Sequence, residues 1–83
     1  MVLGPDLSPD GNSIAYFAAA RSGGMQIFTL RLSGGTPTQV TSNPLVVHAI
    51  PRWSADGQAL YFYLTDKTAA YSKVGAPRIA AAP

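Results

Sequence analysis

The sequence has no cysteine, no glutamate and a single histidine, His48, in its 83 residues. Without cysteine it can form neither a disulfide framework nor a thiolate metal site, and its redox compartment is left open. One histidine excludes a metal site with two imidazole ligands. We therefore expect His48 to be an ordinary side chain at the end of a strand, and no metal is predicted.

Charge is also scarce. Six Lys and Arg residues against four Asp give a net charge of +2, and the basic residues are scattered along the chain. A nucleic-acid interface needs clustered basic residues with stacking aromatic residues between them, so no nucleic-acid partner is expected. No apolar run approaches the roughly 18 residues of a membrane span. The first residues lack the basic and apolar regions of a secretory signal.

Sequence motifs for catalysis and cofactor binding are absent as well. No G-x-S-x-G nucleophile motif occurs, and the paired glycines at 23–24 and 34–35 fit neither a dinucleotide fingerprint nor a P-loop. We read these glycines as turn residues. The sequence therefore predicts no catalytic residue and no cofactor.

Hydrophobic residues make up 47% of the chain, and 8 Gly and 7 Pro residues punctuate it. The apolar content argues against intrinsic disorder. The Gly and Pro content argues against a helical bundle, and no window shows an amphipathic helix. The sequence therefore predicts an all-β fold.

An internal repeat organises the sequence. Residues 5–17 align without a gap with residues 51–63, an offset of 46 residues. Asp-Gly pairs recur in both copies and are strong hairpin signals, because Gly accepts a positive φ and Asp bonds its own backbone. The residues expected to form the structural repeat motif are Ser8, Pro9, Asp10, Gly11, Trp53, Ser54, Asp56 and Gly57.

Short strands separated by turns follow each Asp-Gly pair. Their expected ranges are 13–20, 25–32, 37–41, 46–53, 59–65 and 69–74. The tail from Ala80 to Pro83 is read as loop, because prolines bracket it. In range 59–65, Leu60 and Phe62 alternate with Tyr61 and Tyr63, so both faces of the strand are apolar. Such strands need a neighbouring sheet on each side. The four tyrosines, which are Tyr16, Tyr61, Tyr63 and Tyr71, are expected to pack in the core.

The order Leu7-Ser8-Pro9-Asp10-Gly11, Ile14-Ala15-Tyr16, Gln26-Ile27-Phe28, Gln39-Val40-Thr41, Pro51-x-Trp53-Ser54-x-Asp56-Gly57 and Leu60-Tyr61-Phe62 resembles the WD40-like repeat of TolB-type β-propellers. The resemblance covers about residues 5–64. It implies four-stranded β-propeller blades. Leu7 stands where Trp is common in the family, which implies weaker packing between blades. Ala55 stands where Pro is common, which implies a looser second turn.

This resemblance divides the chain into residues 1–42, a first blade with a partial innermost strand, and residues 43–83, a second blade whose outer strand is missing or irregular. Propellers need four to eight blades to close a ring, and about two are present here. Three explanations stay open, namely a fragment of a longer propeller, a truncated reading frame, or assembly of several copies. A chain that has lost its function is a further alternative.

The chemistry-bearing residues favour structural roles. The spacing of Asp10 and Asp56 places them in equivalent turns of neighbouring blades rather than in one acid pair. Ser8 and Ser54 are expected to bond the backbone or the adjacent carboxylate. Trp53 is expected to anchor blade packing, with ligand binding at a channel mouth as the alternative.

The favoured function is therefore a non-enzymatic β-propeller module that provides a protein-binding, sensor or scaffold surface. The resemblance implies contacts through the loops at 21–24, 42–44 and 66–68, and a location in the periplasm or cell envelope. The alternative is part of the gating propeller of a prolyl-oligopeptidase-like serine peptidase, with the nucleophile elsewhere. The expected partners are a protein or further blades.

Overall fold

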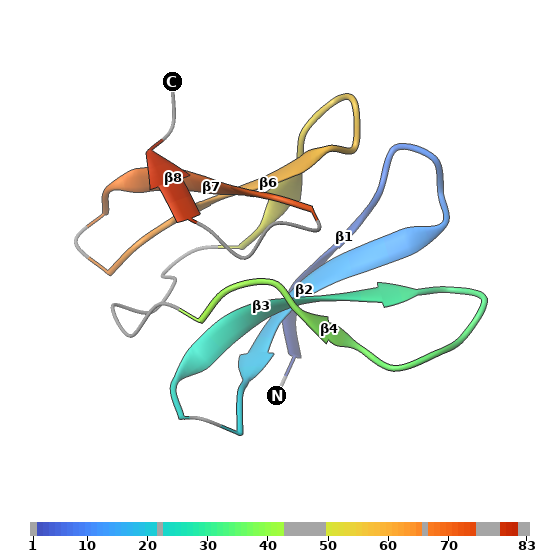
Figure 1. Ribbon diagram of the computed structural model, residues 1–83, viewed down its shortest axis with the longest axis horizontal. Coiled ribbons are helices and arrows are strands. Elements are labelled where there is room, and N and C mark those ends of the chain that lie inside the picture. Colours follow the sequence, from blue (N-terminus) through green and yellow to red (C-terminus); the bar gives the residue numbers. More distant parts are fainter. Residues whose placement is uncertain (1, 22, 43–49, 66, 75–78, 82–83) are drawn as a thin grey trace.

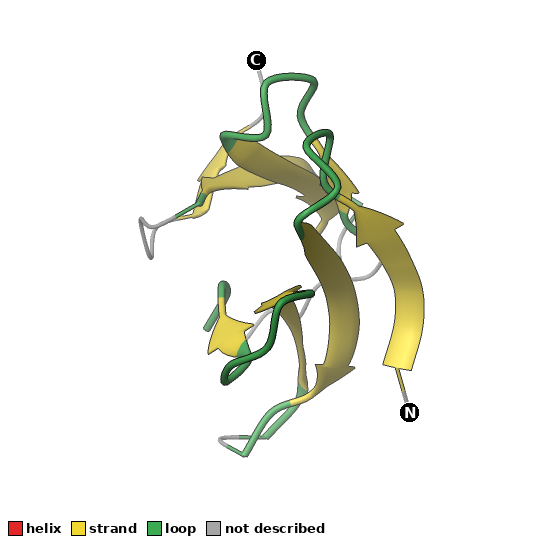
Figure 2. Ribbon diagram, turned by 90° about the vertical axis from the view of Figure 1, so that its right-hand side faces the viewer, coloured by secondary structure: helices red, strands yellow, loops and turns green. Residues whose placement is uncertain are grey.

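The computed structural model describes the backbone of residues 2–21, 23–42, 50–65, 67–74 and 79–81. Within these ranges the chain forms strands joined by loops and turns, and no helix (Figure 2). His48 lies outside the described residues, as do Asp66 and residues 43–44 of one expected loop. The strands are β1 (Val2–Leu7), β2 (Ser13–Ala19), β3 (Met25–Arg31), β4 (Thr38–Gln39), β5 (Arg52–Trp53), β6 (Ala59–Tyr63), β7 (Ala69–Lys73) and β8 (Ile79–Ala81).

These strands form two four-stranded antiparallel sheets. Their strand orders are β1-β2-β3-β4 and β5-β6-β7-β8, so every strand pairs with its neighbour in sequence. In Figure 1 the β5–β8 sheet lies above the β1–β4 sheet. The predicted all-β class is confirmed.

The two sheets have equivalent pairings, with one difference in length. Ser13 pairs with Arg31 in the first sheet, and Ala59 pairs with Lys73 in the second. The equivalent residues of β2 and β6 are therefore 46 apart, but those of β3 and β7 are only 42 apart. The β2–β3 hairpin is four residues longer than the β6–β7 hairpin. The sequence offset alone does not reveal this, because the repeat signal fades beyond residue 63.

The end of the chain differs from the sequence expectation. The prediction of loop for the tail, with a missing or irregular outer strand in the second repeat, is wrong, because Ile79–Ala81 forms β8 and pairs with β7. An edge strand is held by backbone hydrogen bonds, which three small or β-branched residues provide as well as any others. Such a strand leaves almost no pattern of alternation in the sequence. The first repeat likewise has a full innermost strand, the six-residue β1, rather than a partial one.

The hydrophobic core lies between the two sheets. Ala15, Phe17 and Ile27 on the β1–β4 sheet belong to the same buried cluster as residues of the β5–β8 sheet. The latter are Leu60, Phe62, Leu64 and Ala70. Leu60 is fully buried and Phe62 is 3% exposed. Burying one such side chain contributes about 1.5–3 kcal/mol, so this shared core holds the sheets face to face.

The opposite face of the β5–β8 sheet is open. Tyr61 is 39% exposed and Tyr63 is 49% exposed, so the expectation that they pack in the core is wrong for this chain. The cause is that successive side chains of a strand point to opposite faces: Leu60 and Phe62 point to the core, so Tyr61 and Tyr63 point away from it. Tyr71, opposite Tyr61 in the register, shares this open face.

Candidate interaction surfaces

The two Ser-x-Asp-Gly turns have the same hydrogen-bond network. The Ser8 hydroxyl donates to Asp10 Oδ1 at 2.6 Å and accepts from the Ser13 amide at 3.0 Å. The Asn12 amide donates to the same Asp10 oxygen at 2.9 Å. Gly11 has a φ of 76°, which explains the glycine.

The second turn repeats these bonds residue for residue. The Ser54 hydroxyl donates to Asp56 Oδ1 at 2.6 Å and accepts from the Ala59 amide at 3.0 Å. The amide of Gly57 donates to the Ser54 carbonyl at 3.0 Å, against 2.9 Å in the first turn. The expected loosening of the second turn is therefore not present in its geometry. Proline at this position limits the unfolded chain more than it changes the folded turn.

Both turn carboxylates are held in the ionised form. The hydroxyl of Ser8 lowers the pKa of Asp10, and the Asn12 amide adds to the effect. The hydroxyl of Ser54 lowers the pKa of Asp56 in the same way, with a further contribution from the Gln58 amide. Each carboxylate accepts hydrogen bonds within its own turn. The two turns lie side by side, and Asp10 and Asp56 both line one open groove of about 290 Å³.

A clasp between Asp6 and Trp53 joins the innermost strands of the two sheets. The backbone amide of Trp53 donates to Asp6 Oδ2 at 2.9 Å. The indole Nε1–H of Trp53 donates to the Asp6 carbonyl at 2.9 Å. Trp53 also packs against the core cluster. Sequence reasoning missed Asp6, because its counterpart in the second repeat is Arg52 and the position carries no repeat signal.

Buried polar groups beside the core are bonded within the first sheet. Thr41 Oγ1 accepts from the Ile27 amide at 3.0 Å and donates to Gln26 Oε1 at 2.6 Å. Gln39 Nε2 donates to the Thr41 carbonyl at 2.8 Å. Within the described part of the chain, no buried side-chain nitrogen or oxygen lacks a partner. The polar groups of these residues are hydrogen-bonded within the protein, so they do not indicate a ligand site.

An open groove of about 640 Å³ lies between the sheets beside Trp53. Its lining is mostly hydroxyls, glycines and one cation, and comprises Ser13, Thr29, Arg31, Gly34, Gly35, Thr36, Thr38, Gln39, Val40, Trp53 and Val74. Nothing among these residues forms a nucleophile–base pair or a carboxylate cluster. Among the described residues as a whole, no three His, Cys, Asp or Glu side chains gather as a metal site.

The β2–β3 and β6–β7 hairpin loops lie at the same end of the two sheets, at the left of Figure 1. The two loops close alike. The Gly23 amide donates to the Ala20 carbonyl at 3.0 Å, and the Lys67 amide donates to the Leu64 carbonyl at 2.8 Å. Lys67 has a φ of 67° at the position where the first loop has Gly23. Arg21 and Lys67 are both exposed. These loops are the described parts of two of the three expected contact loops.

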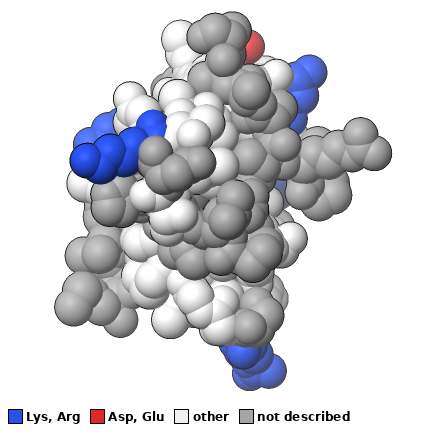
Figure 3. Space-filling model, turned by 90° about the vertical axis from the view of Figure 1, so that its left-hand side faces the viewer, with Lys and Arg blue, Asp and Glu red and all other residues white. Residues whose placement is uncertain are grey.

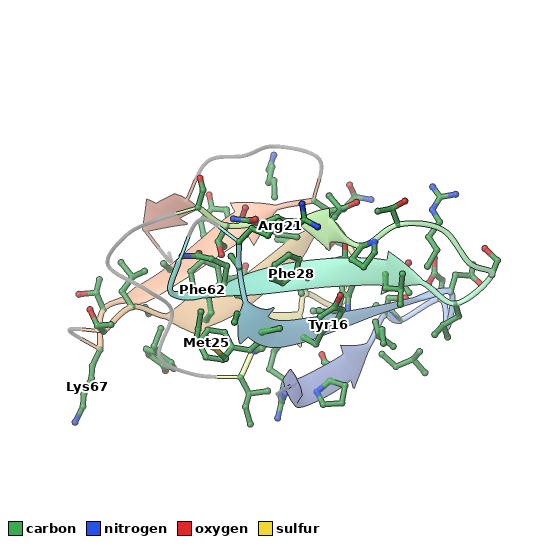
Figure 4. All side chains as sticks on the ribbon, turned by 90° about the horizontal axis from the view of Figure 1, so that it is seen from below. Tyr16, Arg21, Met25, Phe28, Phe62 and Lys67 are labelled. Atoms are coloured by element: carbon green, nitrogen blue, oxygen red, sulfur yellow. The ribbon has the colours of Figure 1, made fainter. Side chains whose placement is uncertain are left out.

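Two sheet faces stay open beyond the shared core. The Tyr16 face is the outer face of the β1–β4 sheet, where the Tyr16 and Phe28 rings stack with centroids 5.7 Å apart (Figure 4). The Tyr61 face is the outer face of the β5–β8 sheet, where the Tyr61 and Tyr71 rings are also 5.7 Å apart. By register, the Tyr16 face includes Leu7, Ile14, Tyr16, Ala18, Gln26, Phe28, Leu30 and Gln39. The Tyr61 face includes Arg52, Ala59, Tyr61, Tyr63, Ala69, Tyr71 and Lys73.

Charged residues form no continuous patch in the described part of the face shown in Figure 3, where Lys and Arg side chains stand apart near the outline. This arrangement agrees with the low net charge and offers no extended track for a phosphate backbone. The described part of the chain contains no helix that is long and apolar enough to cross a membrane.

Four-stranded antiparallel sheets, each made of consecutive strands and stacked face to face through a shared core, define blades of a β-propeller. The comparisons with known proteins agree. The fold resembles that of a putative TolB from Agrobacterium tumefaciens, with a TM-score of 0.84 and 21% identity, over 98% of this chain and 30% of that protein. It also resembles TolB from Acinetobacter baumannii, with a TM-score of 0.77 and 21% identity, over 96% of this chain and 21% of that protein.

No family model and no curated protein matches the sequence. The chain therefore has the fold of TolB-type β-propeller blades, and it spans less than a third of the length of either solved TolB structure. At 21% sequence identity, this structural similarity establishes the fold alone.

Proposed function

We propose that the chain is a non-enzymatic β-propeller repeat module of a larger TolB-like ring, and that this ring serves as a protein-binding or scaffold surface. The division into repeats at 1–42 and 43–83 belongs to the same proposal. The two sheets fall on either side of that boundary.

The observation that carries the proposal is that the open Tyr16 face of the β1–β4 sheet is equivalent in register to the covered face of the β5–β8 sheet. Leu60 and Phe62 of the β5–β8 sheet lie on the face that the β1–β4 sheet covers. Their equivalents, 46 residues earlier, are Ile14 and Tyr16, which belong to the open Tyr16 face. A surface built like a blade interface is best explained by another blade that covers it. Leaving it open forfeits about 1.5–3 kcal/mol for each such side chain.

A chimera tests membership of a larger ring. This chain replaces the aligned segment of the Agrobacterium tumefaciens protein, and a matched chimera carries Phe62→Asp in the shared core. We expect the first chimera to be a monomer that melts in one cooperative transition with Tyr63 protected from solvent, and the Phe62→Asp chimera to lose this transition. An unfolded first chimera, or one with Tyr63 as exposed as in the free chain, would contradict the proposal.

Protein binding is assigned to the hairpin loops at one end of the sheets, because loops on a rigid scaffold carry contacts. A photo-crosslinking amino acid at Arg21 or Lys67 is expected to capture a single protein in the source cells, and purified components should reproduce the adduct. The control position is Leu32, which is 55% exposed in the β3–β4 connection at the other end. Equal capture from all three positions, or from none, would contradict this assignment.

The alternative role in a gating propeller has a separate test. An α/β-hydrolase nucleophile motif in the reading frame next to this chain would support it. No observation on the described residues favours that role.

A further inference from the structure

Comparison of the strand pairings within the two sheets shows which residues of the Tyr61 face correspond to residues on the core side of the β1–β4 sheet. Asp6 pairs with Ala15 there, and Arg52 pairs with Tyr61 at the equivalent place. An acceptor is thus replaced by a cation, and a fully buried methyl group by a phenol. The equivalent pairs, in order, are Asp6 and Arg52, Ala15 and Tyr61, and Thr29 and Tyr71.

The Tyr16 face also differs in side-chain size from the covered face that it resembles. At the covered face, small residues Ala70 and Ser72 lie opposite Phe62 and Leu60. On the Tyr16 face these positions hold large residues, and the anchor Trp53 is replaced by a smaller side chain. The equivalent pairs are Ala70 and Phe28, Ser72 and Leu30, and Trp53 and Leu7.

Two copies of this chain therefore cannot repeat the internal interface between them. In a contact that repeated the internal one, four positions that are small there would carry the large residues Tyr61, Tyr71, Phe28 and Leu30. Overpacking of this kind forces side chains off their rotamers and moves the backbone. Two positions that are large there, Ile27 and Trp53, would carry the smaller Ala69 and Leu7.

The clasp is lost as well. Arg52 has only donors, so it cannot accept the amide hydrogen that Asp6 accepts from Trp53. Leu7 has no indole to donate. The guanidinium of Arg52 instead bonds the Pro51 carbonyl at 3.1 Å and lies exposed on the Tyr61 face.

We propose that the Tyr61 face docks a sheet other than a second copy of this chain, one that presents a carboxylate to Arg52 and small side chains to Tyr61 and Tyr71. This rests on the proposed membership of a larger ring and adds the chemistry of the neighbour. The support is continuity with the internal interface and charge complementarity, because the described residues of the Tyr61 face include two cations, Arg52 and Lys73, and no acid. Tyr and Arg are also enriched among the residues that contribute most to binding at protein interfaces.

The test supplies that chemistry from the chain itself. The acidic variant Leu7→Asp, Phe28→Ala, Leu30→Ser places a carboxylate and two small residues where the next copy would meet Arg52, Tyr61 and Tyr71. Its matched control is Leu7→Lys, Phe28→Ala, Leu30→Ser. Sedimentation velocity measures association over a range of concentrations, and circular dichroism with Trp53 fluorescence checks that each variant is folded.

We expect the acidic variant to associate head to tail at least about tenfold more tightly than the lysine control, with a dependence on salt. Adding Arg52→Glu should abolish association of the acidic variant and restore it in the lysine variant. Equal association of the two variants would overturn the proposal.

The unsubstituted chain gives an independent reading that does not depend on how the variants fold. Hydroxyl-radical footprinting should find Tyr61 and Tyr63 accessible at all concentrations at which the chain is soluble. A defined oligomer in which both tyrosines are protected would overturn the proposal. The ring chimera described above can succeed whatever the result here, so failure of the neighbour's chemistry is separable from failure of the proposed function.

Discussion

The contact between Asp6 and Trp53 makes a prediction about how the two sheets are coupled. Replacing Asp6 with Ala removes the carboxylate that accepts the Trp53 amide at 2.9 Å. A hydrogen bond to a charged group contributes about 1.5–3 kcal/mol, and the amide is left part-buried without this acceptor. We therefore expect Asp6→Ala to lower the free energy of unfolding by about 2 kcal/mol. The carbonyl that accepts the indole hydrogen is a backbone group and remains.

The assay uses the fact that Trp53 is the only tryptophan in the chain. Urea unfolding followed by Trp53 fluorescence reports the contact between sheets, and far-ultraviolet circular dichroism reports the strands. The control is Asp6→Asn, which keeps an acceptor oxygen and should lose less than half of the effect. If Asp6→Ala shifts the free energy by less than about 0.5 kcal/mol, the value of an ordinary surface change, the clasp does not couple the sheets.

Three further predictions concern the turns and the core. Because the pKa values of Asp10 and Asp56 are lowered, the stability that these carboxylates contribute is fully present above the unfolded pKa of about 3.9. It is lost as the pH falls through their lower folded pKa values. In a variant with both residues changed to Asn, the free energy of unfolding should depend less on pH in that range, and an unchanged dependence would refute the role of these two carboxylates. Lys67→Gly should raise the free energy of urea unfolding by up to about 1 kcal/mol, because Lys67 has a φ of 67°; a destabilised variant would show that the lysine side chain has a compensating contact. Phe62→Ala should lower the free energy of unfolding by about 3–5 kcal/mol in the same assay, and Tyr63→Ala should lower it by less than about 0.5 kcal/mol. The reason is that the Phe62 side chain is buried and the Tyr63 side chain is 49% exposed. Similar losses at both positions would show that the Tyr61 face is covered in solution.

The sequence predicts those parts of the fold that depend on local chemistry. The Asp-Gly turns recur because each needs a positive φ and a serine hydroxyl at a fixed distance, and such needs are visible in any single copy. The strand β8 was not predictable, because its three residues contribute backbone pairing and almost no pattern.

The covered face of each strand was not predictable either. In Ala59–Tyr63 both faces are apolar, so alternation identifies two surfaces without saying which one meets the other sheet. The clasp at Asp6 escaped for a related reason, since its partner lies 47 residues away and its repeat equivalent is Arg52.

What repeats and what diverges in this chain follows from the different demands on the two kinds of position. A turn residue satisfies its own backbone, so the same residues serve in every copy. An interface residue must complement one particular neighbour. If the Tyr61 and Tyr16 faces carried the residues of the covered faces, each copy could dock on the next as the two sheets dock within the chain, and copies could associate in any number. Divergence at the interface positions, with conserved turns, therefore restricts each face to one kind of neighbour while it leaves the blade itself unchanged.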